Sequence, residues 1–283
     1  AGQTETHPFS SSDLETEGGT AVWQAAEDEG VDPAVDLDDP DLTVYVECRA
    51  DDAYVFLEKR DGPGGLPLGT QRPVVALVSG GIDSPVAAWE MMRRGCPIVP
   101  LYVDLGDYGG PDHRARAQST VDALARYAPN TDLRLHVAPA GEAVDRIVDS
   151  TDDHRMLVLR RFMFRVAAAV ADDVGAVGIV SGEAIGQKSS QTSANLRVTS
   201  AVTDYPVYRP LLTLDKSDIT ARARSLGTYD DATIPAGCNR VAPPFPETAA
   251  SLSAVEATEP DDIDSLVRGV AADVTDSTVV RRP

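Results

Sequence analysis

Apolar residues occur in continuous runs along most of the chain, and each run is followed by a segment of helical periodicity. The apolar runs cover residues 74–78, 97–103, 133–137 and 176–181. The helical segments lie near residues 84–94, 112–127, 140–149 and 154–173. A strand that is apolar at every position is buried on both faces, as in a parallel sheet between two layers of helices. The pattern predicts a doubly wound α/β domain, extended by a strand over 205–211 and a helix over 215–226.

The residues before this domain follow a different pattern. Alternation from Thr43 onward predicts a hairpin with strands over 43–48 and 53–58. Two strands alone are only marginally stable, so the hairpin is expected to belong to a small α+β region. Residues 62–73 are rich in glycine and proline and mark the predicted boundary. The expected parts are a disordered or linking segment (1–20), the small α+β region (21–72), the doubly wound domain (73–245) and a C-terminal helical tail (246–283).

The first strand of the domain runs directly into the sequence SGGIDS, residues 79–84. Its glycines let the backbone approach an anion closely, and Ser84 is expected to cap the next helix with Pro85 at the first helical position. An ordinary glycine-containing turn needs only one cap, so two hydroxyls and a carboxylate around two glycines favour an anion site. The chain has no GxxxxGK[ST], and no GxGxxG follows a predicted strand. Because Asp83 would repel a phosphate unless a divalent cation lay between them, the loop also predicts Mg²⁺.

Arginines precede acidic residues along the helix expected near 154–174, which reverses the order that a helix dipole favours. Solvent-exposed side chains are the simplest explanation for Arg155 and Arg165. For the adjacent pair Arg160 and Arg161, exposure and phosphate binding are equally consistent with the charge alone, since a guanidinium matches phosphate geometry.

A long polar segment, residues 179–196, follows the last of the four apolar runs and contains mainly small residues and glycines. Such a segment is either mobile or functional. Gly182 lies at the carboxyl end of its strand, beside the expected ligand position of the sheet, which favours contact with a nucleotide. Of the three lysines in the chain, Lys188 and Lys216 fall in this segment and before the last core helix.

The net charge of −20 would ordinarily argue against a nucleic-acid partner. The near absence of lysine and the spread of aspartate, however, indicate a salt-adapted, halophilic cytoplasm, where the Debye length falls to about 3 Å and only local charge matters. Net charge therefore does not exclude such a partner. The sequence has no apolar run of membrane-spanning length, so a cytosolic protein without membrane contact is expected.

The three cysteines, Cys48, Cys96 and Cys238, are widely spaced and form no CxxC pair. This pattern excludes a disulfide scaffold and a zinc ribbon and fits a reducing compartment. Cys96 is expected in the core, and Cys48 has no evident partner. Cys238 lies in a loop with proline and glycine, close to Arg240, and a chance loop thiol is the alternative to a reactive thiolate there.

Taken in order, the segments SGGIDSPVA, LRRFMFRVA, SGEAIGQKSSQT and RPLLTLDKSDI resemble the catalytic domain of the tRNA 4-thiouridine synthetases, or tRNA sulfurtransferases. The resemblance to this ThiI family covers roughly residues 30–245 and implies a PP-loop ATP pyrophosphatase that forms AMP. The residues implied to flank the adenine and ribose are Leu77, Val78, Tyr102 and Val103. Those implied to hold the pyrophosphate are Ser79, Gly80, Gly81, Asp83 and Ser84. The nucleotide site would be completed by Arg160, Gly182 and Gln191, and the adenylation step assisted by Lys216.

The same resemblance implies a reaction with ATP and Mg²⁺ in which a tRNA uridine is first adenylated and then attacked by sulfur. Cys238 would accept or relay sulfur as a persulfide, supplied by a cysteine desulfurase or as sulfide. The hairpin resembles the closing part of a THUMP domain, whose first half is expected to be missing or divergent. No second sulfur-carrying cysteine of the rhodanese type is evident, so the resolving thiol is unassigned. A homodimer would let one subunit present RNA to the active site of the other.

Two other readings remain open on the sequence alone. The first is a PP-loop enzyme that adenylates a different acceptor, for amination or for thiolation at another tRNA position. The second is a nucleotide-binding RNA module without turnover, which would bind ATP and release no pyrophosphate. The joint presence of SGGIDS, the LDK triplet and Cys238 favours an enzyme over such a module.

Overall fold

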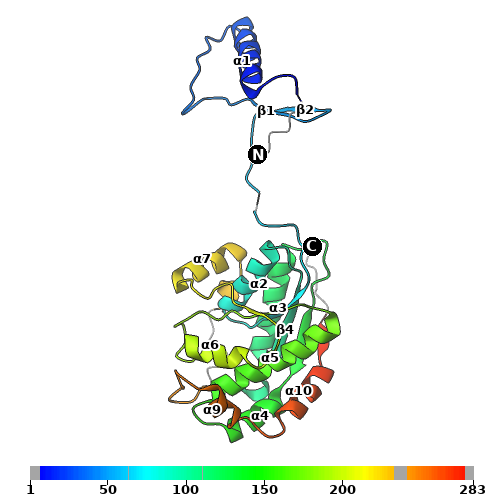
Figure 1. Cartoon of the computed structure of the whole chain (residues 1–283), viewed down its shortest axis with the longest axis vertical. Coiled ribbons are helices and arrows are strands. Elements are labelled where there is room, and N and C mark those ends of the chain that lie inside the picture. The colour runs from blue at the N-terminus through cyan, green and yellow to red at the C-terminus, as the bar shows by residue number, and fades with distance from the viewer. Residues whose placement is uncertain (1–6, 63, 110, 233–240, 278–283) are drawn as a thin grey trace. The chain divides into compact units, whose positions relative to one another are not determined.

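The computed structural model describes residues 7–62, 64–109, 111–232 and 241–277. Its internal contacts divide the chain into two compact units, Ala1–Gly64 and Gly65–Pro283. Each unit has its own secondary structure (Figure 1). The division falls inside the segment rich in glycine and proline that separates the two sequence patterns.

The first unit begins with a helix that the sequence analysis did not predict. α1 (Ser11–Asp28) starts at Ser10, whose hydroxyl accepts from the Asp13 amide while the Asp13 carboxylate accepts from the Ser10 amide. This reciprocal capping box satisfies two amides that a helix start otherwise leaves unpaired. The expectation of a disordered or linking segment over 1–20 is therefore corrected from Ser11 onward. Two central glycines and the lack of any buried residue on α1 obscured its helical pattern.

The hairpin of the first unit agrees with the alternation in the sequence. β1 (Tyr45–Cys48) pairs in antiparallel register with β2 (Ala53–Phe56), and Tyr45 lies opposite Phe56. The rings of these two residues stack at 5.4 Å, and the Lys59 ammonium lies 4.0 Å from the centre of the Tyr45 ring. Cross-strand aromatic contacts of this kind stabilise a short hairpin that has little apolar surface to bury.

The second unit is built on a sheet whose strands follow the order β7-β6-β3-β4-β5-β8 within the described residues. Its strands are β3 (Val74–Leu77), β4 (Ile98–Asp104), β5 (Leu135–Pro139), β6 (Ile179–Val180), β7 (Val207–Tyr208) and β8 (Thr275–Ser277). All neighbours are parallel except β5 and β8. From β3 the chain proceeds to β4 and β5 on one side and later to β6 and β7 on the other. The order therefore reverses at β3, which is where ligands bind in such sheets.

Helices cover both faces of this sheet (Figure 1). One face packs against α2 (Asp83–Arg93), α3 (Pro111–Ala125) and α7 (Lys216–Leu226). The other packs against α4 (Gly141–Ser150), α5 (Arg155–Val174) and α10 (Ile263–Ala272). The short helices are α6 (Ser193–Ser200), α9 (Leu252–Glu256) and the 3₁₀ turns Gly106–Tyr108 and Asp230–Ala232. The predicted doubly wound α/β fold is confirmed, while α6 forms where the sequence analysis expected the end of a loop.

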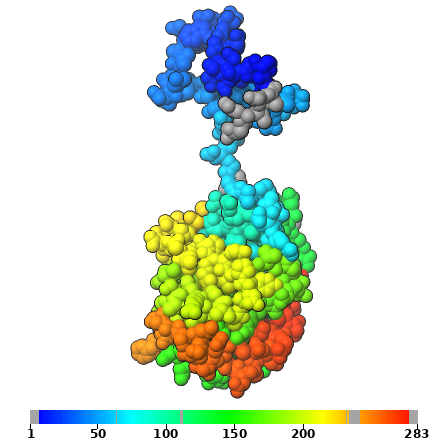
Figure 2. Space-filling model, viewed as in Figure 1, coloured from blue at the N-terminus to red at the C-terminus, as the bar shows by residue number. Residues whose placement is uncertain are grey.

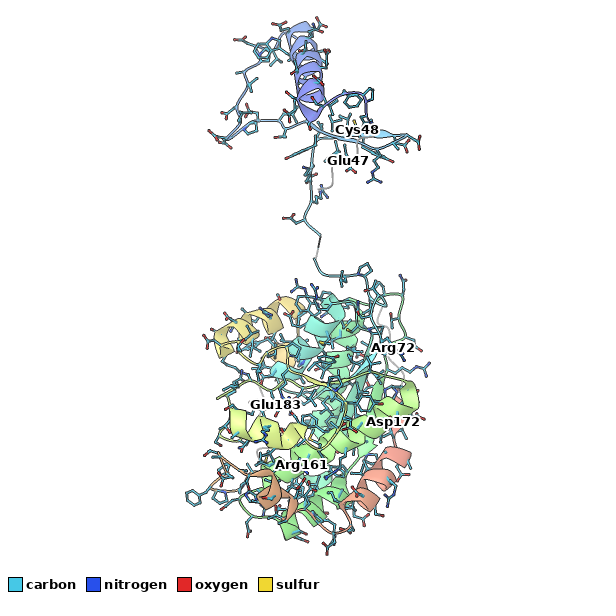
Figure 3. The ribbon with its side chains drawn as sticks, in the orientation of Figure 1. Glu47, Cys48, Arg72, Arg161, Asp172 and Glu183 are labelled. Atoms are coloured by element: carbon cyan, nitrogen blue, oxygen red, sulfur yellow. The ribbon has the colours of Figure 1, made fainter. Side chains whose placement is uncertain are left out.

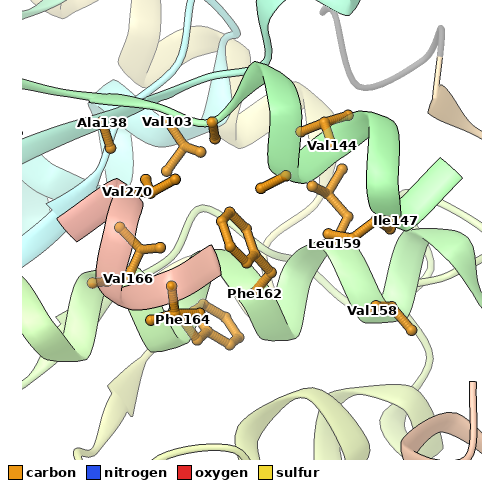
Figure 4. Close-up of a cluster of buried hydrophobic side chains, with 14 of the residues drawn as sticks. Val103, Ala138, Val144, Ile147, Val158, Leu159, Phe162, Phe164, Val166 and Val270 are labelled. Atoms are coloured by element: carbon orange, nitrogen blue, oxygen red, sulfur yellow. The ribbon is translucent and has the colours of Figure 1, made fainter. Parts of the chain in front are cut away.

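α5 forms the centre of one apolar layer. Phe162 and Phe164 on this helix are fully buried and belong to the same cluster as Val144 and Ile147 of α4 and Val270 of α10 (Figure 4). The C-terminal helices complete this layer, as the orange and red residues of Figure 2 show beside the green ones. Among the described residues, no helix combines the length and the apolar character needed to cross a membrane.

Candidate active site

The loop between β3 and α2 is closed by its own two hydroxyl groups. The Ser79 amide donates to Ser84 Oγ at 2.9 Å, the two hydroxyl oxygens lie 3.1 Å apart, and the Gly81 amide donates to Ser79 Oγ at 3.2 Å. These bonds hold the glycines between them in a fixed path. The start of α2, where free amides and the helix dipole favour an anion, thereby lies at the carboxyl end of the central strand.

Ser84 does not cap α2, which corrects the prediction from the sequence. α2 begins at Asp83, the residue before Ser84, and no side chain caps its start at Ile82. Pro85 is accordingly the third helical residue rather than the first. The Ser84 hydroxyl is already used within the loop, since it also donates to the Ser79 carbonyl at 3.3 Å. An uncapped helix start keeps its first amides available for a ligand.

Two glycines bring neighbouring segments against this loop. A Cβ on Gly80 would lie 2.8 Å from Arg116 Cβ of α3. A Cβ on Gly182 would lie 2.9 Å from the Ser84 nitrogen. β6 pairs directly with β3, so the loop that follows β6 packs against the start of α2 with no room for a side chain at Gly182.

Lys216 brings a third segment to the same place. It is the first residue of α7, and its Nζ donates to Asp83 Oδ1 at 2.5 Å and to Gln187 Oε1 at 3.5 Å. The segments after β3, β6 and β7 therefore meet at the start of α2. This arrangement joins two residues, Asp83 and Lys216, that lie 133 positions apart in the sequence.

Asp83, the acidic residue of this loop, could bind a cation that is also bound by phosphate oxygens. The described residues contain no group of three or more histidine, cysteine, aspartate or glutamate side chains that could hold a metal ion. Mg²⁺, however, is commonly bound by one carboxylate together with phosphate oxygens and water. Asp83, whose side chain is partly exposed at the start of α2, is suited to be that carboxylate.

Glu183 is a buried carboxylate placed between two arginines (Figure 3 labels Glu183). Its Oε2 accepts from Arg209 Nε at 2.8 Å. Its Oε1 lies 2.7 Å from Arg160 Nη1 as an ion pair that lacks hydrogen-bond alignment. Arg160, which the sequence analysis assigned to the nucleotide site, is thus held beside Gly182.

Gln191, another expected nucleotide residue, shapes the loop after β6. Its carbonyl accepts from the Gly186 amide at 3.0 Å, and its side-chain Oε1 accepts from the Ala184 amide at 3.4 Å. Both bonds fold the loop back toward Gly182. The structure therefore brings Gln191 to the same loop as Gly182, where it turns the backbone.

The residues expected to flank the adenine are mostly buried. Val78, Tyr102 and Val103 are at most 5% exposed, and Leu77 is partly buried. Tyr102 and Val103 point to opposite faces of the sheet, because adjacent residues of a strand alternate. Burial, with a contribution from Asp104, raises the pKa of Tyr102 to about 12, so its hydroxyl stays neutral. Contact of these residues with a nucleotide would involve mainly their backbone at the strand ends.

The other arginines of α5 have structural roles. Arg161 is 1% exposed and pairs with Glu259 Oε1 at 2.5 Å, and Arg165 pairs with Glu259 Oε2 at 2.7 Å (Figure 3 labels Arg161). Arg155 donates to the Thr151 carbonyl at 2.8 Å. The expectation that Arg155 and Arg165 are solvated is therefore wrong, because both bind neighbouring groups. The sequence did not decide between exposure and phosphate binding for Arg160 and Arg161. In the structure, Arg161 is buried and its guanidinium is used in core ion pairs.

The cysteines divide between the core and the rest of the chain. Cys96 is buried, as expected, and burial raises the pKa of its thiol. Cys48 is a free, partly buried thiol of the first unit. Cys238 lies outside the described residues, so its expected role in sulfur transfer stays a prediction.

Sequence reasoning missed two charged residues next to this site, Arg116 and Glu183. Both are less than a tenth exposed. A signal existed for Glu183, since it is the only acid in a stretch of mainly small residues that directly follows a buried strand. Arg116 gave no comparable signal, because its importance comes from contact with Gly80 across two elements.

We expect Gly182→Ala to weaken nucleotide binding strongly. The new methyl group would meet backbone atoms of Asp83 and Ser84 at 2.9–3.0 Å, which only a shift of the loop or of α2 can relieve. Overpacking of this kind costs about 1–3 kcal/mol. Calorimetric titration with a nucleotide measures the effect, and Gly269→Ala, where nothing lies within 4 Å, is the matched control. Equal affinities of both variants would contradict the close packing at Gly182.

Comparison with known proteins places the two units in separate families. The ThiI family, described as thiamine biosynthesis protein, matches residues 69–262, and the THUMP domain matches residues 3–58. The THUMP match begins well before the hairpin. It therefore includes residues that the sequence analysis assigned to a disordered segment and extends the resemblance beyond the closing part of that domain.

Curated proteins and solved structures give the same result. A probable tRNA sulfurtransferase of Halobacterium salinarum, a halophile, is 62% identical over 95% of this chain and 68% of its own length. A second one, of Methanosarcina acetivorans, is 43% identical over 87% of this chain and 60% of its own length. The crystal structure of a 4-thiouridine synthetase in complex with RNA and bound ATP is 29% identical and covers 98% of this chain and 72% of its own, with a TM-score of 0.82.

Proposed function

Because the chain belongs to the ThiI family, we propose that it is a tRNA sulfurtransferase, which uses ATP to convert a tRNA uridine into 4-thiouridine. The observation that carries this proposal is the meeting of three segments at the start of α2. SGGIDS, the loop with Gly182 and the Lys216 side chain converge there at the switch point of the sheet. The structural neighbour with bound ATP and RNA supports both the nucleotide and the partner.

The proposed reaction has two steps. In the first, the uridine O4 attacks the α-phosphorus of ATP, an O–P bond forms, and pyrophosphate leaves. The loop amides and Lys216 are positioned to stabilise the negative charge that develops on the phosphates. Mg²⁺ bound by Asp83 and the phosphates would neutralise further charge. The N3 proton of the uridine is lost to solvent, and the base becomes an adenylate whose C4–O bond is ready to break.

In the second step, a sulfur nucleophile attacks C4 and AMP leaves with the former O4. When the sulfur is the outer atom of a persulfide on Cys238, a second thiol must then form a disulfide with Cys238, so that the sulfur stays on the base. With free sulfide, no such thiol is needed. A sulfur nucleophile is strong at neutral pH, so the proposed reaction assigns no role to a histidine base.

We also propose tRNA as the partner, which the THUMP match and the family support. The proposal includes a cytoplasmic location for the reaction and a cysteine desulfurase or sulfide as the sulfur source. A homodimer, in which one subunit's first unit presents RNA to the other's active site, is part of the same proposal. Full activity of a particle with monomeric mass at high salt would contradict the dimer and leave the chemistry untouched.

The test of the function is 4-thiouridine formation on unmodified tRNA in high salt, with ATP and Mg²⁺. We expect Cys238→Ser to lose thiolation with a persulfide donor and to retain it with sulfide, while AMP continues to form. Cys48→Ser, a change of the free thiol in the first unit, is the control and is expected to behave as wild type.

Different outcomes separate the alternatives. In the wild type supplied with sulfide, AMP release without thiolated base would keep the ATP pyrophosphatase and count against uridine C4 as the acceptor. ATP binding without AMP release would support a binding module. Equal loss in Cys238→Ser with both sulfur donors would mean that this thiol does more than carry sulfur.

A further inference from the structure

Three charged side chains, one of them buried and two mostly buried, form a cluster beside the proposed nucleotide site. Glu183 comes from the loop after β6, Arg160 from α5, and Arg209 follows β7. Their side chains are 3%, 17% and 10% exposed. Removing charges from water is costly, and a buried ion pair often contributes little to net stability. Two cations around one buried anion therefore suggest a role other than holding the fold together.

The two arginines of this cluster differ in how they are held. Arg209 donates from Nε to Glu183 and from Nη2 to Ser200 Oγ at 2.9 Å, and its guanidinium lies 5.7 Å from the centre of the Phe164 ring. Arg160 has a single polar contact in the part of the chain that the structure describes, the ion pair with Glu183. Arg209 is anchored on several sides, whereas Arg160 keeps most of its donors for another group.

Glu183 is held beside the start of α2, where the free donors of Arg160 could bind a ligand. Its backbone neighbour Gly182 packs on the Ser84 amide at the start of α2. Arg209 holds one carboxylate oxygen, and the other oxygen faces Arg160. A carboxylate held in this way sets both the location and the orientation of the Arg160 guanidinium, while the net charge of the cluster stays positive.

We propose that Glu183 is a positioning residue, which holds Arg160 next to the start of α2 so that its free donors bind a phosphate of ATP. The inference rests on the proposed function, because it takes ATP as the ligand. Guanidinium groups bind phosphate through paired, directional hydrogen bonds, so their orientation determines the strength of binding. Pairing with one oxygen of the Glu183 carboxylate restrains the Arg160 guanidinium and leaves its other donors able to bind phosphate.

The test is a double-mutant cycle on the affinity for a non-hydrolysable ATP analogue with Mg²⁺, measured by calorimetric titration in high salt. We expect Glu183→Gln and Arg160→Gln each to weaken binding by about tenfold, and the double variant to be no weaker than Arg160→Gln alone. The reason is that Glu183 acts through Arg160. The proposal would be overturned if the loss of affinity in the double variant equalled the product of the two single losses. A loss of affinity below about twofold in Glu183→Gln would also overturn it.

The matched control is Arg165→Gln, on the same helix. Arg165 is 18% exposed and pairs with Glu259 at 2.7 Å, so its exposure and its ion-pair distance match those of Arg160, 17% and 2.7 Å. We expect it to lower the melting temperature without changing the affinity for the analogue. If it weakens binding as much as Glu183→Gln does, general destabilisation explains both and the proposal fails.

Two further outcomes keep the test decisive. Should Glu183→Gln not fold, Glu183→Asp retains the charge with a shorter reach, and the same cycle with Arg160→Gln applies to it. Because the cycle measures binding and not thiolation, it is independent of the acceptor. If the enzyme thiolates tRNA but the effects of the two substitutions on affinity are additive, only the role of Glu183 is rejected. If the two effects are coupled but no thiolation occurs, only the acceptor chemistry is rejected.

Discussion

Asp83→Asn is expected to lower the rate of 4-thiouridine formation by about 10²–10³-fold, the usual effect of removing one group that stabilises transition-state charge. The substitution keeps the shape of the side chain and removes its charge. Asparagine is a poor ligand for a cation that bridges phosphates, and it also releases Lys216 from its ion pair. The measurement is the single-turnover rate of thiolation at saturating ATP.

Loss of folding cannot account for such a decrease. The Asp83–Lys216 pair is partly exposed, with 31% and 50% of the two side chains accessible, so it contributes at most about 1 kcal/mol to stability. Asp218→Asn, in the first turn of α7, removes an exposed acid near the same lysine and serves as the control. A rate for Asp83→Asn within about tenfold of wild type would contradict a direct role of this carboxylate in the reaction.

Arg161→Gln is expected to destabilise the second unit by about 3–5 kcal/mol, the range for breaking a buried ion pair by removal of one partner. Arg161 is almost fully buried and binds Glu259 at 2.5 Å, the Val198 carbonyl at 2.8 Å and Glu256 at 3.3 Å. Glutamine cannot reach all three groups. Denaturant unfolding followed by Trp89 fluorescence measures the effect, in a Trp23→Phe background that removes the tryptophan of the first unit.

The control for this prediction is an exposed pair of the same type. Arg146 and Asp262 lie 3.3 Å apart with about half of each side chain accessible, so Arg146→Gln is expected to cost less than about 1 kcal/mol. A similar loss of stability in Arg146→Gln and Arg161→Gln would show that burial does not determine the contribution of an ion pair to stability.

Acid provides a second check on Arg161. Burial would raise the pKa of Glu259, but hydrogen bonds from Arg165 and Arg161 outweigh it and hold that pKa below its ordinary value. A lowered pKa in the folded state means that the stabilisation is complete above the unfolded value, about 4.3, and is lost as the pH falls through the folded value. The difference in the free energy of unfolding between Arg161→Gln and wild type should therefore become smaller only in acid, below about pH 4.

The sequence predicted the central strands because burial on both faces admits only apolar residues, whatever their neighbours. β3 and β4 were located to within one residue in this way. α6 was not located, because its residues are mainly small and polar. Its position depends on tertiary bonds, such as the one that the buried Asn195 side chain donates to the Glu247 carbonyl at 2.8 Å. Pattern alone contains no trace of such a bond.

The site was predictable where one short segment carries its chemistry. SGGIDS contains the glycines, hydroxyls and carboxylate of the loop within six consecutive positions, 79–84. Arg160 and Arg161 were not distinguishable, because adjacent helical residues point about 100° apart and either one faces the core until the packing of the helix is known. In the folded unit it is Arg161 that faces inward and pairs with Glu259, which is 98 positions away.

The same separation sets the order in which the protein can fold. Residues of α9 and α10, among them Val255 and Val267, complete the apolar layer around α5. Synthesis at 5–20 residues per second leaves about 5–20 s between the appearance of Arg161 and that of Glu259, 98 positions later. During this interval β3 and α4 can already pack on α5, whereas the part of the helix that α9 and α10 cover is still exposed. The layer around α5 therefore closes only after α9 and α10 have been synthesised, and until then the nascent chain offers chaperones a partly exposed helix.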